Sequence, residues 1–283
     1  MPYNHSENEF QSSKDNFKIF YQKWIPASYD RVLVVQHGFG EHSGRYMNLV
    51  NALDGQGIAI YALDSRGHGR TGGKRGHVDQ FQQFVDDLAD LIQLAKKETS
   101  KSKIYLLGHS LGGVIVLQYS LQGTNQENLH ALVVSSGGLM IRMDPEKHVK
   151  LTFAKLLASL TPATTVNANL DLKFLSHDQS VIDAYVKDPL VHGMMSFQMA
   201  VNTVRLGALI YEKASHLQIP IYIIHGSGDG IVNPEGSKKL FNMLTCPDKT
   251  LKIYDGLYHE TFNELPADRE KVLGELREWL KKH

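Results

Sequence analysis

The sequence contains a single cysteine among its 283 residues, and this scarcity excludes two kinds of protein. One thiol forms no disulfide within the chain and builds no zinc site from thiolate ligands. Cys246 lies in no motif, so we expect a passive thiol. The 14 histidines also lack the His-Glu-x-x-His spacing of a zinc hydrolase. We therefore expect neither a metal ion nor a cofactor.

A net charge is also missing, because 30 lysines and arginines balance 30 aspartates and glutamates. This balance provides no attraction to nucleic acid, and we expect no nucleic-acid partner. No apolar run approaches the roughly 18 residues that cross a bilayer. The first ten residues lack the basic start and apolar run of a secretory signal. We expect a cytoplasmic protein, and peripheral contact with a membrane remains compatible with the sequence.

Short apolar runs are present instead, and helical patterns lie between most of them. A strand that is apolar throughout is typical of a parallel sheet buried on both faces. The alternation of such runs with helices predicts a mostly parallel sheet flanked by helices. The turn-forming residues 14–16 predict an antiparallel hairpin at the sheet edge. The expected strands are 32–35, 58–63, 104–107, 131–134, 221–224 and 251–254, and the expected helices are 47–53, 81–97, 111–121 and 267–282.

The interval 138–217 breaks this alternation, because it contains no convincing strand. Within it, Phe153, Leu156, Leu157 and Leu160 fall on one helical face. The sequence predicts a helical cap at 138–217, inserted into one α/β core formed by residues 1–137 and 218–283.

The segment 104–113 is the most informative part of the chain. It is expected to form a strand, a sharp turn at Gly108-His109-Ser110-Leu111-Gly112, and a helix. Such a turn forces the serine into a strained conformation that exposes its hydroxyl at the carboxyl edge of the sheet. The glycines allow strand and helix to approach where a Cβ has no room. This arrangement predicts the α/β-hydrolase fold, with Ser110 as the nucleophile.

A serine nucleophile needs a base and an acid, and in this fold they follow it in the order acid, then histidine. His259 lies between the last expected strand and the last expected helix, at the same sheet edge as Ser110. Asp229 follows the strand 221–224 and is the expected acid. Asp255 is the competitor, four residues before His259. We prefer Asp229 because it comes from a different strand end and can approach the far side of the imidazole.

Acyl transfer also needs two N–H donors for the developing oxyanion. The amide of Leu111, directly after the nucleophile, is expected to be one. The second is expected from the loop after the strand 32–35, where the flanking glycines would let the amide of Phe39 point inward.

Four motifs together resemble the monoacylglycerol lipase and lysophospholipase family of α/β-hydrolases. The resemblance runs from about residue 24 to the C-terminus and includes the cap. It implies that Glu41, Arg45 and His109 bind the polar glycerol end of a substrate, and that Tyr185 matches a tyrosine of the family's cap. Phe39 departs from the family, in which a small residue is usual, and its side chain is expected to narrow the pocket. The motifs are residues 37–46, 64–69, 108–113 and 249–259.

These observations predict a serine hydrolase that cleaves carboxylic esters of single-chain lipids, such as a monoacylglycerol or a lysophospholipid, through an acyl-enzyme. One alternative is a capped aminopeptidase, in which Asp171, Asp178, Asp183 and Asp188 would bind an α-amine. Another is a hydrolase fold that binds a ligand without catalysis. Residues 67–72 match the Gly-x-Gly-x-x-Gly pattern of dinucleotide sites, but no helix is expected to start there, so we interpret them as a structured loop. The sequence gives no indication of the oligomeric state.

Overall fold

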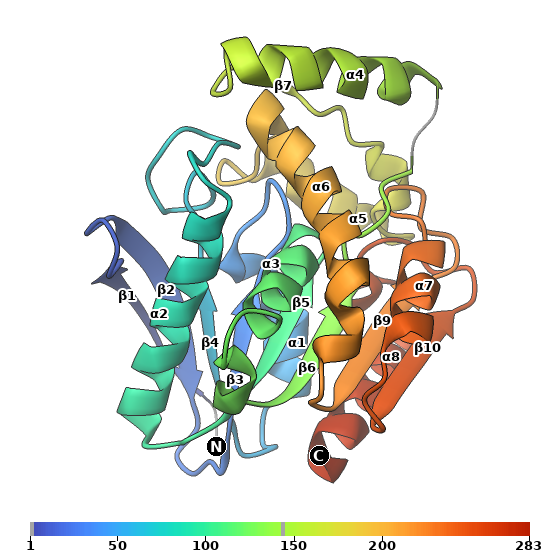
Figure 1. The fold of residues 1–283 in the computed structure, drawn as a ribbon. Helices are drawn as coiled ribbons and strands as arrows, with labels where there is room; N and C mark the ends of the chain where they lie inside the picture. The colour runs from blue at the N-terminus through green and yellow to red at the C-terminus, as the bar shows by residue number, and fades with distance from the viewer. Residues whose placement is uncertain (1–2, 143–144) are drawn as a thin grey trace.

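An eight-stranded sheet forms the centre of the computed structural model, which describes residues 3–142 and 145–283 (Figure 1). The strand order is β1-β2-β4-β3-β5-β6-β9-β10. The first three strands in this order pair antiparallel, and all later neighbours pair parallel. The strands are β1 (Asn4–Gln11), β2 (Lys18–Ile25), β3 (Arg31–Gln36), β4 (Ile58–Leu63), β5 (Ile104–His109), β6 (Leu129–Ser135), β9 (Ile221–Gly226) and β10 (Lys249–Tyr254).

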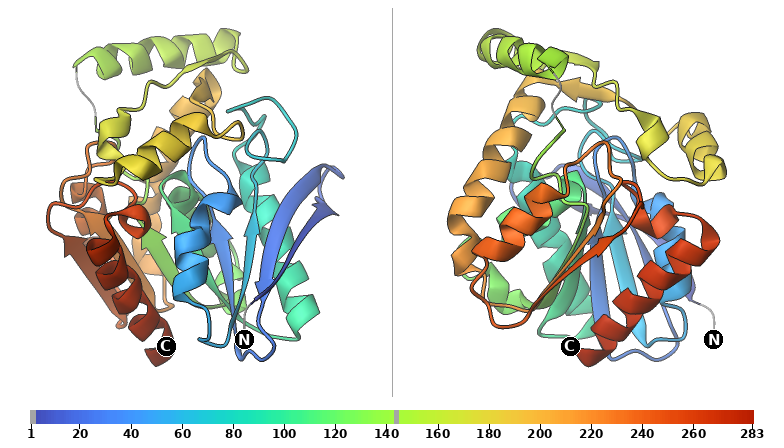
Figure 2. Two further views of the ribbon diagram at one scale, coloured as in Figure 1. Left: turned by 180° about the vertical axis from the view of Figure 1, so that it is seen from behind. Right: turned by 90° about the vertical axis from the view of Figure 1, so that its right-hand side faces the viewer.

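Helices cover both faces of this sheet (Figures 1 and 2). One apolar cluster joins the sheet to α2 (Gln82–Thr99), α3 (Leu111–Ser120), α6 (Phe197–Lys213) and α7 (Glu235–Met243). The opposite face packs against α1 (Met47–Ala52) and α8 (Pro266–Lys282). The described part of the chain has no helix of the length and apolar character needed to cross a membrane. Short 3₁₀ helices lie at Ser43–Tyr46, Asn125–Asn128, Leu172–Phe174, Ala214–His216 and Thr261–Asn263.

The α/β-hydrolase architecture expected from the sequence is confirmed. The hairpin, the six apolar strands and the four expected helices all form, and the strands after the hairpin agree with their expected bounds to within two residues. The helix α7 was not expected. Its buried residues are Gly236, Ser237 and Leu240, which are too few apolar side chains to give a helical period.

The segment between β6 and β9 begins beyond the carboxyl ends of the parallel strands, and its last helix, α6, runs from there along one face of the sheet (Figures 1 and 2). It contains α4 (Pro145–Leu160), α5 (Gln179–Lys187) and α6. The expectation of no strand in this interval was wrong, since β7 (Thr165–Asn167) pairs with β8 (Met194–Ser196). Strands of three residues are too short to show an alternating pattern.

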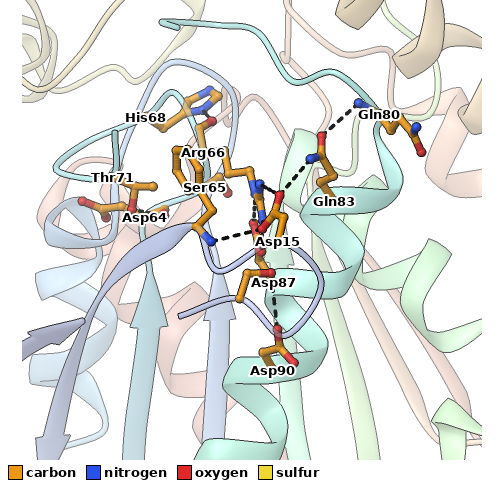
Figure 3. A network of polar contacts seen from close by, with 12 residues as sticks. Asp15, Asp64, Ser65, Arg66, His68, Thr71, Gln80, Gln83, Asp87 and Asp90 are labelled. Atoms are coloured by element: carbon orange, nitrogen blue, oxygen red, sulfur yellow. Dashed lines mark hydrogen bonds and ion pairs between the residues drawn. The ribbon is translucent and has the colours of Figure 1, made fainter. Parts of the chain in front are cut away.

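A buried arginine holds the loop between β4 and α2 (Figure 3). The Arg66 guanidinium donates from Nε and Nη2 to Asp87 of α2, at 2.6 and 2.8 Å, and from Nη2 to Asp15 of the hairpin turn at 2.8 Å. The hydrogen bonding of Arg66 to Asp15 lowers the pKa of the Asp15 carboxyl to about 2. Gly67 and Gly69 of this loop have φ angles of 69° and 50°, and no helix starts there, so the Gly-x-Gly-x-x-Gly stretch is a structured loop as predicted.

Candidate active site

Ser110 lies at the turn between β5 and α3. Its φ of 54° and ψ of −118° place a non-glycine residue in a strained conformation, as the sequence predicted. The glycine requirement is also confirmed, because a Cβ on Gly108 would lie 2.4 Å from the Gly112 carbonyl oxygen, and one on Gly112 would lie 2.2 Å from that of Gln36. Ser110 lines a cavity, and its hydroxyl forms no hydrogen bond within the described residues. The strained turn therefore presents an unengaged hydroxyl to the cavity.

The expected base and acid lie side by side. His259 Nδ1 donates a hydrogen bond to Asp229 Oδ2 at 2.7 Å. Asp229 Oδ1 accepts the amides of Ile231 and Val232, at 2.8 and 2.9 Å, which orients the carboxylate. His259 lines the same cavity as Ser110, and with Nδ1 engaged, its Nε2 is the nitrogen left to exchange a proton there.

The competing acid does not contact the imidazole. Asp255 is exposed, and its Oδ1 accepts the Ser227 hydroxyl at 3.0 Å. Asp229 is fully buried, so it pairs with His259 away from solvent. Of the two candidate acids, the structure brings Asp229 to the imidazole.

The Asp229–His259 pair has the electrostatics of a charged acid beside a basic imidazole. Burial opposes ionisation of Asp229, but the charge of His259 and hydrogen bonds from His225 and His259 hold the pKa of Asp229 well below its usual value. Burial also opposes a charge on His259, but Asp229 outweighs it and raises the pKa of His259. Asp229 therefore stays ionised and stabilises an imidazolium when His259 takes up a proton.

Two backbone amides lie against Ser110 without an acceptor. Phe39 and Leu111 both line the cavity, and within the described residues neither amide donates a hydrogen bond. The loop of Phe39 runs directly over Ser110, since a Cβ on Gly38 would lie 3.1 Å from the serine Cβ. The carboxylate of Glu41 accepts the Gly38 amide at 2.7 Å and holds this loop. Both expected oxyanion donors are thus near Ser110 and form no hydrogen bond within the described residues.

A buried ion cluster lies beside Ser110. The Arg45 guanidinium donates to Glu41 at 2.9 Å and to Glu260 at 2.8 Å, and its Cζ lies 4.7 Å from the centre of the Tyr185 ring. Burial opposes the charge of Glu41, but Arg45 lowers the pKa of that carboxyl to about 2. The structure therefore brings Glu41, Arg45 and Tyr185 together. Glu260 was missed, although it follows His259 directly in the sequence.

His109 completes this polar end of the cavity. Its ring centre lies 4.8 Å from that of His259, and both line the cavity. Burial, together with the charge of His259, lowers the pKa of His109 to about 4. His109 is therefore neutral at pH 7. Its Nδ1 lies 3.4 Å from the buried Ser135 hydroxyl, and its Nε2 is left to exchange a hydrogen bond with a hydroxyl group.

The cavity has a volume of about 1040 Å³. This is just above the range of roughly 300–1,000 Å³ that is typical of ligand pockets. Phe39 lines the cavity but does not close it, because its ring packs edge-on against His68 and His192, with centres 6.1 and 5.8 Å away. Away from the polar end, many lining side chains are apolar: Phe153, Ala154, Leu157, Val166, Leu170, Met195, Phe197, Ala200 and Val204.

The four aspartates of the aminopeptidase alternative do not form one site. Only Asp171 lines the cavity. Asp178 caps α5 by accepting the amide of Ser180 at 3.0 Å, Asp183 accepts a side-chain hydrogen bond from Gln179, and Asp188 pairs with His42 at 2.9 Å. Three of the four thus have local partners outside the cavity.

Comparisons with known proteins agree with this geometry. The sequence model of the family described as Serine aminopeptidase, S33 (Hydrolase_4) matches residues 27–266. The monoacylglycerol lipase of Mycolicibacterium smegmatis is 35% identical over 280 residues, covering 98% of each chain. The chain belongs to the monoacylglycerol lipase family. The mouse monoglyceride lipase, another similar protein, is 31% identical over 94% of this chain and 88% of its own.

Solved structures of this family superpose on the chain. The monoacylglycerol lipase of Paleococcus ferrophilus has a TM-score of 0.80 at 31% identity and covers 99% of this chain and 98% of its own. A soluble variant of the Saccharomyces cerevisiae monoglyceride lipase, in complex with a substrate analog, has a TM-score of 0.87 at 26% identity. It covers 100% of this chain and 96% of its own. Family membership confirms the α/β-hydrolase fold and the class of carboxylic ester hydrolase. It favours the esterase over the aminopeptidase alternative.

Proposed function

We propose that this protein hydrolyses long-chain monoacylglycerols, with Ser110 as nucleophile, His259 as base and Asp229 as acid. One observation supports this most directly. The Ser110 hydroxyl, the His259–Asp229 pair and the free amides of Phe39 and Leu111 lie where a polar pocket meets a large apolar cavity. An ester with one polar and one apolar end would place its carbonyl at this junction.

The chemistry would proceed in two half-reactions. His259 takes the Ser110 proton, and the serine oxygen attacks the ester carbonyl. The amides of Phe39 and Leu111 stabilise the oxyanion, and His259 then protonates the leaving alcohol. Water, activated by the same imidazole, hydrolyses the acyl-enzyme and frees the serine. Asp229 keeps the proton of His259 on Nδ1 throughout.

The segment 138–217 would act as a cap that encloses the acyl chain. It provides most of the apolar lining, including Leu157 and Phe153 of α4 and Val204 of α6. A long acyl chain gains free energy with each methylene group that this lining removes from water, at about 0.8 kcal/mol per group. The cap would therefore favour long chains over short ones.

The polar end suits an uncharged head group. Two carboxylates, Glu41 and Glu260, surround the single guanidinium of Arg45, which is already bonded to both. A phosphate placed there would face two negative charges and, among the residues that the structure describes at this end of the cavity, no free cation. Glycerol hydroxyls can instead hydrogen-bond to the carboxylates and to neutral His109. We therefore favour a monoacylglycerol over a lysophospholipid.

A turnover panel tests the substrate. We expect kcat/KM for long-chain glyceryl monoesters to be at least tenfold higher than for acetyl esters, since two methylene groups already give about a tenfold preference. We also expect it to be at least tenfold higher than for lysophosphatidylcholine of the same chain length, because the phosphate would face the carboxylates of Glu41 and Glu260. Equal or better turnover of the choline lipid would contradict the head group, and a preference for acetyl esters would contradict the acyl-chain proposal. Release of an aminoacyl anilide without ester turnover would favour the aminopeptidase alternative.

We also propose that the cap contacts a lipid surface. In Figures 1 and 2, α4 is the outermost element at this end of the molecule. Leu156 and Leu160 expose 61% and 70% of their surface there, while Phe153 is both exposed and part of the cavity lining. The exposed apolar face is thus continuous with the cavity, so a lipid could pass from a bilayer to the active site without crossing water.

Two outward-facing substitutions test this contact. The double variant Leu156→Ser/Leu160→Ser is expected to sediment several-fold less with phosphatidylcholine vesicles, with turnover of a soluble nitrophenyl ester unchanged. Neither residue lines the cavity. Val186→Ser is the matched control, since Val186 is 65% exposed on α5. If the double variant and the control bound vesicles equally, α4 would not be the contact.

A further inference from the structure

We propose that His225 is a positioning residue for the catalytic acid, and that Ser237 selects the ring tautomer in which His225 does so. This inference rests on the proposed function, because it gives Asp229 its role. His225 Nε2 lies 3.0 Å from Asp229 Oδ2, the same oxygen that accepts His259 Nδ1. His225 Nδ1 lies 2.7 Å from the hydroxyl of Ser237. The result is a continuous hydrogen-bonded chain from α7 to the active-site imidazole.

The direction of each hydrogen bond follows from Asp229. An ionised carboxylate only accepts hydrogen bonds, so His225 Nε2 must carry a proton and donate it to Asp229. When the ring carries only this proton, its Nδ1 has a lone pair, and the Ser237 hydroxyl donates to it. The opposite tautomer would put a lone pair against the carboxylate. Ser237 thus supports the one tautomer of His225 that assists Asp229.

This arrangement is fully buried and comes from three separate elements. His225, Asp229 and Ser237 are all inaccessible to solvent. His225 is on β9, Asp229 on the loop after it, and Ser237 on α7. Water therefore does not substitute for a lost donor, and the hydrogen bond to an ionised group is stronger here than at the surface.

Two effects on catalysis follow. The Asp229 carboxylate accepts hydrogen bonds from His225, from His259 and from the amides of Ile231 and Val232. These four bonds leave it no freedom to rotate away from His259. In addition, the donor from His225 takes up part of the negative charge on Oδ2. Asp229 then stabilises the His259 imidazolium less than a carboxylate with one imidazole would.

Other charged groups also act on His259. Glu41 and Glu260 raise its pKa, and the neutral ring of His109 packs against it. On the other side, Arg142 donates to the backbone carbonyl of Asp229. Within the described part of the chain, none of these groups forms a hydrogen bond or ion pair with His225, so a substitution at position 225 removes none of their interactions.

The pH dependence of kcat/KM tests the inference. His259 acts as a base only when it is neutral, so kcat/KM rises with pH through the pKa of His259. In His225→Leu, Asp229 loses one donor and stabilises the imidazolium more strongly. The acid limb of the kcat/KM profile should therefore move to higher pH by about one unit, which lowers kcat/KM about tenfold on the acid side. The plateau value of kcat should also fall, because Asp229 is held less firmly against His259.

His225→Gln is the rescue variant, because the glutamine Nε2 can reach the position of the imidazole Nε2 and donate to Asp229. We expect its acid limb to return to that of the wild type. A limb that stays in place in His225→Leu, or that moves equally in both variants, would overturn the inference and leave His225 a packing residue.

A milder change keeps the test informative if His225→Leu does not fold. Ser237→Ala removes the tautomer selection and should shift the limb in the same direction by a smaller amount. Its matched control is Ser120→Ala, another fully buried helical serine, which bonds only a carbonyl of its own helix. Equal pH profiles of kcat/KM for Ser237→Ala and Ser120→Ala would contradict the role of Ser237. Absence of ester turnover by the wild-type protein would instead contradict the proposed function.

Discussion

Ser110→Ala is expected to lower kcat for a long-chain glyceryl monoester by about 10⁶-fold, the loss seen when a serine hydrolase loses its nucleophile. The reason is that no other hydroxyl has this position. The strained turn directs Ser110 into the cavity beside His259, and the alanine variant retains only the oxyanion amides and substrate binding. Rates would be measured as fatty acid released by purified protein.

A serine-reactive phosphonate probe gives an independent measurement of the same prediction. The wild-type protein and Ser120→Ala should both be labelled, because Ser120 is buried at the far end of α3 and is no part of the site. Ser110→Ala should not be labelled. Labelling that persists in Ser110→Ala, or the absence of labelling in the wild type, would refute Ser110 as the nucleophile.

Asp229→Asn is expected to lower kcat by about 10⁴-fold, by analogy with the same change in other serine hydrolases. An asparagine can turn an N–H toward His259 Nδ1 and so favour the tautomer with its proton on Nε2, which cannot take the serine proton. The side chain is fully buried, so no water restores the missing acceptor. The change is nearly isosteric, and thermal unfolding would show whether the variant stays folded.

Asp255→Asn is the matched control, since Asp255 lies four residues before His259 but is exposed and bonds Ser227. It should keep wild-type kcat and KM. If Asp255→Asn lost activity and Asp229→Asn kept it, the acid would have to be reassigned. If both kept activity, the His259–Asp229 hydrogen bond would have no part in catalysis.

The sequence predicted those parts of the site whose local pattern is tied to a backbone requirement. Ser110 was identified because two glycines flank it where a strand meets a helix. A Cβ at position 108 or 112 would collide with the backbone, so only glycine fits at these two positions. His259 and Asp229 were identified from their places after strands, since parallel strands bring their carboxyl ends to one edge.

Other parts had no local signal. Glu260 joins Arg45 only because the His259 loop and the loop after β3 meet in space. The helix α7 and the strands β7 and β8 were missed because they are short or bury few apolar side chains. His225 was overlooked for a related reason, since its partner Ser237 lies on the helix that was not expected.

By itself, the sequence determined the fold class and the alternation of strands and helices in the core, and it predicted Ser110, His259 and a preferred acid, because these depend on hydrophobic period and on backbone conformations that few residues adopt. Only the tertiary structure decided which aspartate meets the imidazole, how the charges of Glu41, Arg45 and Glu260 are arranged, and which histidine supports Asp229. Hydrogen bonds depend on distance and direction between side chains far apart along the chain, and no local pattern records these quantities.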